Sequence, residues 1–257
     1  LVGKIIQVLT NNPSAFKGLE VITEKQVNYK VWDNPKFKTH KFADALKDMI
    51  CILLGCTRER LEDRDFKERE LPPEWWYWKG VDKLLSINDY SKLNEIQKEY
   101  FELVKTTPRL LLQLMGTECG RQILHPDVWV NAVMANYKPI NYISVPNDDS
   151  IYGGSYTDVI YPDWVITDMR FPNEMEAVES RGGITIRVER PLYCTECSIK
   201  NVDSSDCYNC IMHSDESAHP SEVGLDNAVF QYTIENNGTI LNLVKKIKEI
   251  LIKEKII

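Results

Sequence analysis

Two apolar runs with a short helix-like segment between them limit the folds that this chain can adopt. Trp164–Thr167 and Ile184–Val188 have the length of strands, residues 173–180 between them have the pattern of a short helix, and Gly182-Gly183 marks a turn. A strand–helix–strand unit of this kind places its strands as parallel neighbours with a right-handed crossover. Both runs are continuously apolar, which is typical of a sheet that is covered on both faces. The sequence therefore predicts the α/β class.

The rest of the chain adds helices and one further strand to this unit. Hydrophobic residues at helical spacing predict an opening helix, a second helix that Gly55 closes, and an amphipathic closing helix, over Val2–Leu9, Phe42–Leu53 and Ile240–Lys253. Val229–Ile234 is predicted to be the last strand, whereas residues 136–163 are rich in polar and turn-forming residues and are predicted to be loops.

The charge balance and the hydropathy pattern exclude several classes of protein. The formal net charge is -7, which argues against the basic face that broad nucleic-acid binding requires. A small phosphate pocket built from a few local Arg and Lys residues is still compatible with this charge. No apolar stretch approaches the roughly 20 residues that span a bilayer, and we find no signal-peptide pattern. We therefore expect a soluble, cytoplasmic protein in which Cys51, Cys56 and Cys119 are buried thiols.

Opposite charges follow the first predicted strand directly. Asp168 and Arg170 come just after the apolar run, and in open parallel sheets ligands bind beyond the carboxyl ends of the strands. A carboxylate there suits Mg²⁺ or its water shell, and an arginine two residues later suits a phosphate. An aspartate that caps the next helix, with Arg170 as its partner, explains the same pattern, and these residues alone favour neither interpretation.

A predicted helix over residues 107–121 carries an unusual polar face. Thr107-Pro108 is a typical helix start, and at about 100° per residue the leucines and Met115 fall on one side. The other side holds two glycines and side chains that suit a monophosphate and a base edge, namely Arg109, Gln113, Gly116, Thr117 and Gly120, with Arg121 at its edge. Glycine in a helix costs about 0.5–1 kcal/mol relative to alanine. We therefore expect something to approach closely here, either a ligand, which we favour, or another helix.

Four cysteines form two Cys-x-x-Cys pairs in one short segment, Cys194 with Cys197 and Cys207 with Cys210. This spacing predicts a tetrahedral Cys₄ zinc site, and four thiolates leave no open position, so the Zn²⁺ would be structural. Disulfides are the weaker alternative in a cytoplasmic chain. Lys200 is the only basic residue between the first and last of these cysteines, which disfavours a zinc knuckle that binds nucleic acid.

Six motifs together resemble the phage-type deoxynucleoside monophosphate kinases, a branch of the P-loop nucleoside monophosphate kinases. They occur in the family's order and span most of the chain: "KFADALKDM" (41–49), "TPRLLLQLMGTECGR" (107–121), "DVWVNAV" (127–133), "VITDMRFPNE" (165–174), "IRVERP" (186–191) and "HPSE" (219–222). The resemblance implies a P-loop-kinase-like parallel sheet flanked by helices. It also implies transfer of the γ-phosphoryl group of ATP, with Mg²⁺, to a deoxynucleoside monophosphate.

The resemblance also assigns roles to individual residues. Asp168 and Arg170 would face the phosphates and Arg190 would lie at the entrance of a lid, and these three are the predicted catalytic residues. The predicted substrate-binding residues come from four of the motifs: Phe42, Lys47, Arg109, Gln113, Thr117, Arg121, Trp129, His219 and Glu222. Of these, His219 and Glu222 are assigned to lid anchoring or substrate contact.

The cysteine-rich segment, residues 191–219, lies where nucleoside monophosphate kinases carry their lid. We therefore predict a zinc-bound lid that excludes water from the phosphates, inserted into a kinase core of residues 1–190 and 220–257. The expected partner is the deoxynucleoside monophosphate; membrane and nucleic acid are not expected, and a homodimer is left open.

One departure from the family concerns the phosphate-binding loop. The family opens with a strand and a glycine-rich P-loop, whereas this sequence starts inside the helix that follows, and Gly3-Lys4 has no glycine run before it. We expect the ATP cradle and one central strand to lie in roughly ten to fifteen residues upstream of Leu1. The alternatives are a non-catalytic nucleotide-binding relative without the loop, and a zinc-knuckle protein that binds nucleic acid.

Overall fold

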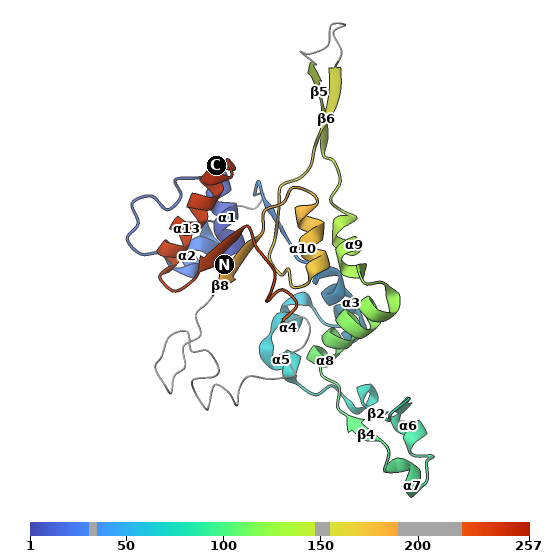
Figure 1. Cartoon of the computed structure of the whole chain (residues 1–257). Coiled ribbons are helices and arrows are strands. Elements are labelled where there is room, and N and C mark those ends of the chain that lie inside the picture. Colours follow the sequence, from blue (N-terminus) through green and yellow to red (C-terminus); the bar gives the residue numbers. More distant parts are fainter. Residues whose placement is uncertain (31–34, 147–154, 190–222) are drawn as a thin grey trace. The chain divides into compact units, whose positions relative to one another are not determined.

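The computed structural model describes residues 1–30, 35–146, 155–189 and 223–257, which fall into two compact units (Figure 1). The terminal unit comprises Leu1–Phe42 and Met134–Ile257, and the middle unit comprises Ala43–Val133. The structure is mixed α/β, as the sequence predicts.

The terminal unit contains two separate pairs of parallel strands. β1 (Lys38–His40) pairs with β7 (Trp164–Ile166), and β8 (Ile186–Glu189) pairs with β9 (Tyr232–Glu235). α10 (Pro172–Glu179) connects β7 to β8, so the predicted strand–helix–strand unit is present. The prediction that its two strands are direct neighbours is wrong for the described residues, because β7 and β8 share no ladder of hydrogen bonds.

One hydrophobic core supports both strand pairs. α1 (Val2–Asn11) and α13 (Ile240–Lys253) contribute most of its buried side chains, which include Ile5 and Ile247, each 0% exposed. Val165 of β7 and Ile186 of β8 both pack against this cluster as partly buried residues. The short helix α2 (Glu24–Tyr29) adds Val27 to the same core.

The segment predicted to be loops contains an antiparallel hairpin instead. β5 (Asn141–Pro146) pairs with β6 (Ser155–Ile160) over six residue pairs, from Asn141 opposite Ile160 to Pro146 opposite Ser155. The prediction was wrong because the polar residues 147–154 dominate the composition. Tyr, Ile and Val on either side of them favour strands.

The middle unit is built mainly from helices around a small core. Leu46, Ile50, Leu61 and Trp129 form this core. The helices are α3 (Asp44–Leu54), α4 (Arg58–Glu62), α5 (Arg64–Glu68), η1 (Pro73–Trp75), α8 (Pro108–Gln113), the π-helix η2 (Leu114–Leu124) and α9 (Val128–Met134). Gly55 closes α3 in the left-handed conformation, with φ of 60°. Only glycine adopts such a conformation at little cost.

A three-stranded antiparallel sheet completes the middle unit. Its strands are β2 (Tyr77–Lys79), β3 (Leu84–Ser86) and β4 (Glu102–Val104), with β2 in the centre. The helices α6 (Ile87–Tyr90) and α7 (Glu95–Lys98) lie in sequence between β3 and β4. The ring of Trp78 stacks on that of Tyr90 at a centroid distance of 3.6 Å.

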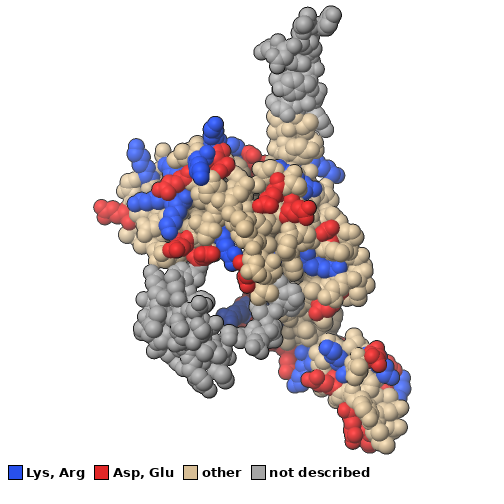
Figure 2. Space-filling view, in the orientation of Figure 1, with Lys and Arg blue, Asp and Glu red and all other residues tan. Residues whose placement is uncertain are grey.

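On the face of the molecule that Figure 2 draws, charges of both signs are mixed, and acidic and basic side chains are interspersed over its described parts.

Cys51 and Cys56 are half-buried and Cys119 is exposed, so the prediction of three buried thiols is wrong, most clearly for Cys119 on η2. Across the described ranges, no helix has the length and apolar composition required to cross a bilayer.

Candidate functional site

In the terminal unit, Asp168 fixes the carboxyl ends of β1 and β7 to each other. Its Oδ1 accepts a hydrogen bond from the backbone N–H of Phe42 at 2.8 Å. The adjacent backbone N–H of Thr167 donates to the carbonyl oxygen of His40 at 3.2 Å. Asp168 therefore lies at the strand end predicted to bind ligands. Phe42, predicted to bind substrate, is only 2% exposed.

Glu174 stabilises the start of α10, and the sequence analysis missed it. Its Oε2 accepts hydrogen bonds from the backbone N–H groups of Arg170 at 2.7 Å and Phe171 at 3.2 Å. The side chain is 2% exposed. A glutamate at the third position of a helix that opens with Pro172 is a recognisable capping signal. The cap that one interpretation assigned to Asp168 is thus supplied here by Glu174.

Arg170 is an exposed cation at the same strand end. Its guanidinium forms no ion pair with a carboxylate of the described chain, and the residue lines the large cavity of the terminal unit. An arginine in this state keeps its five N–H donors for an anionic ligand.

The large cavity of the terminal unit has a volume of about 1310 Å³. Both β7 and β8 line it, through the apolar side chains of Val165, Ile166, Ile186 and Val188. It exceeds the roughly 300–1,000 Å³ of ordinary small-molecule pockets. Its apolar lining is therefore more typical of the interior beside parallel strands than of a pocket for a small ligand.

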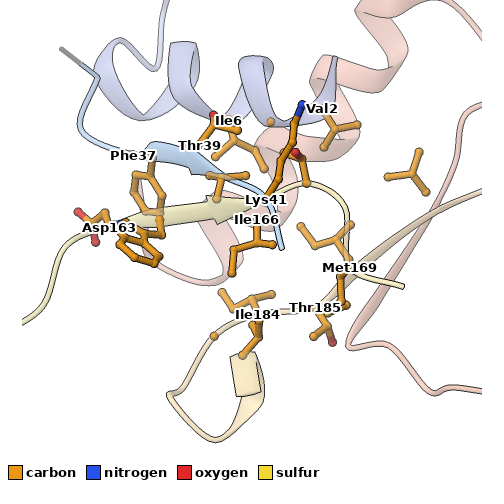
Figure 3. Close-up of a pocket in the computed structure, with 18 of the residues that line it drawn as sticks. Val2, Ile6, Phe37, Thr39, Lys41, Asp163, Ile166, Met169, Ile184 and Thr185 are labelled. Carbon is orange, nitrogen blue, oxygen red and sulfur yellow. The ribbon is translucent and has the colours of Figure 1, made fainter. Parts of the chain in front are cut away.

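Several of the groups that line this cavity suit an anion. Leu1 and the first residues of α1, Val2 to Lys4, line it together with Lys41, Thr167 and Arg170. Figure 3 shows the Lys41 side chain extending towards Val2 in the first turn of α1. Helix N-termini and basic side chains both stabilise phosphate groups.

In the middle unit, both of the predicted phosphate-binding cations on α3 and α8 have carboxylate partners. Lys47 Nζ lies 2.5 Å from Glu62 Oε1, and Arg109 Nε lies 2.5 Å from Glu68 Oε1. Partial burial of Glu62 alone would raise its pKa, but Lys47 and Lys67 outweigh this and hold the pKa below the usual value of a glutamate. Arg109 uses only Nε in its ion pair, so its terminal nitrogens have no partner among the described residues.

The predicted helix over 107–121 changes its geometry after Gln113. α8 ends there, and η2 continues from Leu114 as a π-helix, so an angle of 100° per residue does not apply to Thr117 or Arg121. Gln113, Thr117 and Arg121 are all half-buried. The prediction of one α-helix to Arg121 is therefore wrong.

Protein side chains, not an open surface, approach the two glycines of η2. A Cβ on Gly116 would lie 3.0 Å from Leu46, and one on Gly120 would lie 2.7 Å from the ring of Trp129. The indole N–H of Trp129 donates to the carbonyl oxygen of Gly116 at 2.8 Å. The close approach that we expected from a ligand is made here by α3 and α9.

The predicted site residues fall into three groups. Asp168, Arg170 and Phe42 lie in the terminal unit. The middle unit holds six of them: Lys47, Arg109, Gln113, Thr117, Arg121 and Trp129. Outside the described residues lie Arg190, His219, Glu222 and the four cysteines, Cys194, Cys197, Cys207 and Cys210. The convergence of Arg109 and Arg121 with Arg170 on one nucleotide stays a prediction.

Parallel strand pairs flanked by helices, with charged side chains beyond the strand ends, define an α/β protein with a candidate anion site. Over 242 residues, 83% of this chain and 84% of the relative, the sequence is 25% identical to the deoxynucleoside-5'-monophosphate kinase of Escherichia phage T5. This similarity indicates a distant relationship. No family model matches the chain, and no solved structure matches it.

Proposed function

We propose that the protein is a deoxynucleoside monophosphate kinase, which transfers the γ-phosphoryl group of ATP to a deoxynucleoside monophosphate. The observation that carries this proposal is the similarity to the phage T5 kinase along 83% of the chain. A shared domain alone would not give a match of that extent. Lys41, Thr167 and Arg170, which line the same cavity as the first turn of α1, support a phosphate-binding role for the terminal unit.

In this proposal the terminal unit handles the phosphates. The Asp168 carboxylate, held by the Phe42 N–H, would hold Mg²⁺, and Arg170 would offset charge on the transferred group, with Arg190 as the third catalytic residue. Mg²⁺, when bound, neutralises charge on the phosphate oxygens. The residues present fit it, because a carboxylate at the end of a parallel strand, beside basic side chains, suits a hard cation among phosphates.

The cavity between β7 and β8 supports the expected place of the P-loop strand. Each strand pairs on one side only within the described residues, and both contribute apolar side chains to the cavity. Leu1 and Val2 line the same cavity. A strand that directly precedes α1 would pair with β7 and β8, and the loop after it would bind the phosphates at the first turn of α1.

The middle unit would bind the monophosphate. Arg109 presents its terminal nitrogens, and Gln113, Thr117 and Arg121 follow it along α8 and η2. Lys47 of α3 is the further cation of this proposed pocket. Lys47 exchanges its contact with Glu62 for one with the phosphate.

A zinc-bound lid belongs to the same proposal. Cys194, Cys197, Cys207 and Cys210 have the spacing of a structural site, and the segment of residues 191–219 would close over the phosphates. His219 and Glu222 would anchor this lid or contact the substrate.

The test is a coupled assay of ADP formation by the protein with ATP, Mg²⁺ and each of the four deoxynucleoside monophosphates. We expect turnover with at least one of them. Arg109→Ala should lower kcat/KM by about tenfold to a hundredfold, and Arg64→Ala, an exposed arginine of α5, should not. Absence of transfer to all four substrates contradicts the proposal. Binding of a monophosphate without any response to ATP favours the non-catalytic alternative.

A further inference from the structure

Trp129 in the middle unit has contacts that no substrate-binding role explains. Its side chain is 4% exposed and belongs to the core formed with Leu46, Ile50 and Leu61. The indole N–H nevertheless reaches η2, where it donates to the carbonyl oxygen of Gly116 at 2.8 Å. A tryptophan in this position is part of the interior and is bonded to a neighbouring helix, so its polar atom is not presented to a ligand.

The helix that Trp129 contacts, η2, is π-helical, and this changes the directions in which its side chains point. η2 is a π-helix of 11 residues, and π-helical segments are rare and frequently occur at functional sites. A π turn takes in more residues than an α turn, because its bonds join residues five apart instead of four. Arg121 lies eight positions after Gln113, so it points in a different direction from the one that a continuous α-helix would give it.

Trp129 contacts η2 at two successive glycines, Gly116 and Gly120. Both glycines are buried, so water does not replace a partner lost there. At Gly120 a Cβ would lie 2.7 Å from the Trp129 ring and 2.6 Å from the carbonyl oxygen of Met115. The absence of a side chain at Gly120 therefore leaves the space that the Trp129 ring occupies, whereas at Gly116 the contact is the hydrogen bond to the carbonyl oxygen.

We propose that Trp129 is a positioning residue, which holds η2 in the π-helical register and thereby directs Thr117 and Arg121 towards the nucleotide. The inference rests on the proposed function, but it gives the tryptophan an indirect role. The indole acts through the backbone of η2 and does not touch the substrate.

The experiment compares Trp129→Phe with Trp76→Phe. Phenylalanine keeps an aromatic ring in the core but removes the N–H donor and part of the ring volume, and Trp76→Phe makes the same chemical change. Trp76 is a matched control, because its indole N–H also donates to a backbone carbonyl, that of Leu71 at 2.7 Å, away from η2. Amide hydrogen exchange over residues 114–124 and calorimetric Kd values for the preferred monophosphate are the two readouts.

In Trp129→Phe we expect exchange over residues 114–124 to accelerate by about tenfold and the Kd to rise by about tenfold, with neither change in Trp76→Phe. Gly120→Ala fills the space that the ring occupies, although Trp129 itself is unchanged. It should have the same two effects. Weakened binding with unchanged exchange would mean direct contact and would overturn the inference, as would faster exchange with unchanged binding. A wild-type protein that binds no monophosphate contradicts the proposed function itself, and the exchange data then still decide whether Trp129 holds the register.

Discussion

The backbone N–H of Phe42 and the carboxylate of Asp168, 126 positions apart in the sequence, are joined by a hydrogen bond of 2.8 Å. This bond links the segment after β1 to the segment after β7, at the end of the strands where an α/β protein binds its ligands. Asp168 therefore has a structural contact and a proposed chemical role at the same time. Substitutions can separate the two.

Asp168→Asn should abolish transfer and leave the fold intact. The amide oxygen of asparagine still accepts the Phe42 N–H, whereas the negative charge is lost, so we expect an activity loss of about 10²–10³-fold with an unchanged Tm. Asp168→Ala loses the acceptor as well and should cost about 1 kcal/mol of unfolding free energy. Steady-state kinetics and thermal unfolding of both variants measure this. Asparagine with wild-type activity would remove the carboxylate from the mechanism.

Arg170 should matter for phosphate binding and not for stability. It is exposed and its guanidinium has no carboxylate partner within the described chain, so Arg170→Ala should leave the Tm unchanged. We expect kcat/KM to fall by about a hundredfold in alanine and about tenfold in lysine, which keeps the charge but loses the planar donor pair. Arg64→Ala serves as the control. A Tm that falls together with activity would indicate a structural role instead.

The cavity between β7 and β8 should accept a strand supplied from the N-terminus. A designed extension before Leu1, with about six alternating Val and Ile residues and a short glycine-rich turn, should raise the free energy of unfolding by about 2 kcal/mol or more. It should also slow amide exchange in β7 and β8. An extension of the same length built from Gly and Ser is the control. Equal stability of the two proteins would show that the cavity does not bind a strand.

Zinc should be bound by the cysteine-rich segment. Elemental analysis of protein prepared with Zn²⁺ should find about one ion per chain, and Cys194→Ser should lose it. Cys51→Ser, which changes a half-buried thiol on α3, should retain the metal. Full zinc content in Cys194→Ser would place the ion elsewhere.

Glu62 should give the protein part of its resistance to acid. Its folded pKa is lowered, despite the opposing effect of burial, by Lys47 and Lys67. The stabilisation is therefore complete above the unfolded pKa of about 4.3 and is lost as the pH falls through the folded value. Because the side chain is 43% exposed, Glu62→Gln should cost less than about 1 kcal/mol at pH 7. Urea unfolding of both proteins between pH 7 and pH 3 should show this difference shrinking below about pH 4.3; a constant difference would exclude the ion pair as its cause.

The sequence predicts the helices of this protein better than its strands, and the reason is physical. α13 occupies Ile240–Lys253 as expected, because apolar periodicity and the Thr239 cap are local signals. β2 and β4 have three residues each, and β4 pairs only with β2, which lies far from it in the sequence. Their sequences alone therefore do not identify them.

The sequence predicted site residues whose location follows from the end of a strand. It did not predict contacts between side chains that are distant in the sequence. Asp168 follows directly from the end of a strand, and the structure places it there. The contact of Lys47 with Glu62 joins residues 15 apart on different helices, which no local pattern indicates. The π-helical register of η2 depends on side chains such as Trp129 that lie outside the helix.

Within the described residues, β7 and β8 each pair with a strand on one side only, which bears on how the protein behaves at high concentration. An unpaired strand edge beside apolar side chains is a template on which a strand of another molecule adds. The protein should therefore self-associate through the open edge of β7 or β8 as its concentration rises. Mild heating, which loosens the surroundings of these strands, should turn that association into precipitation.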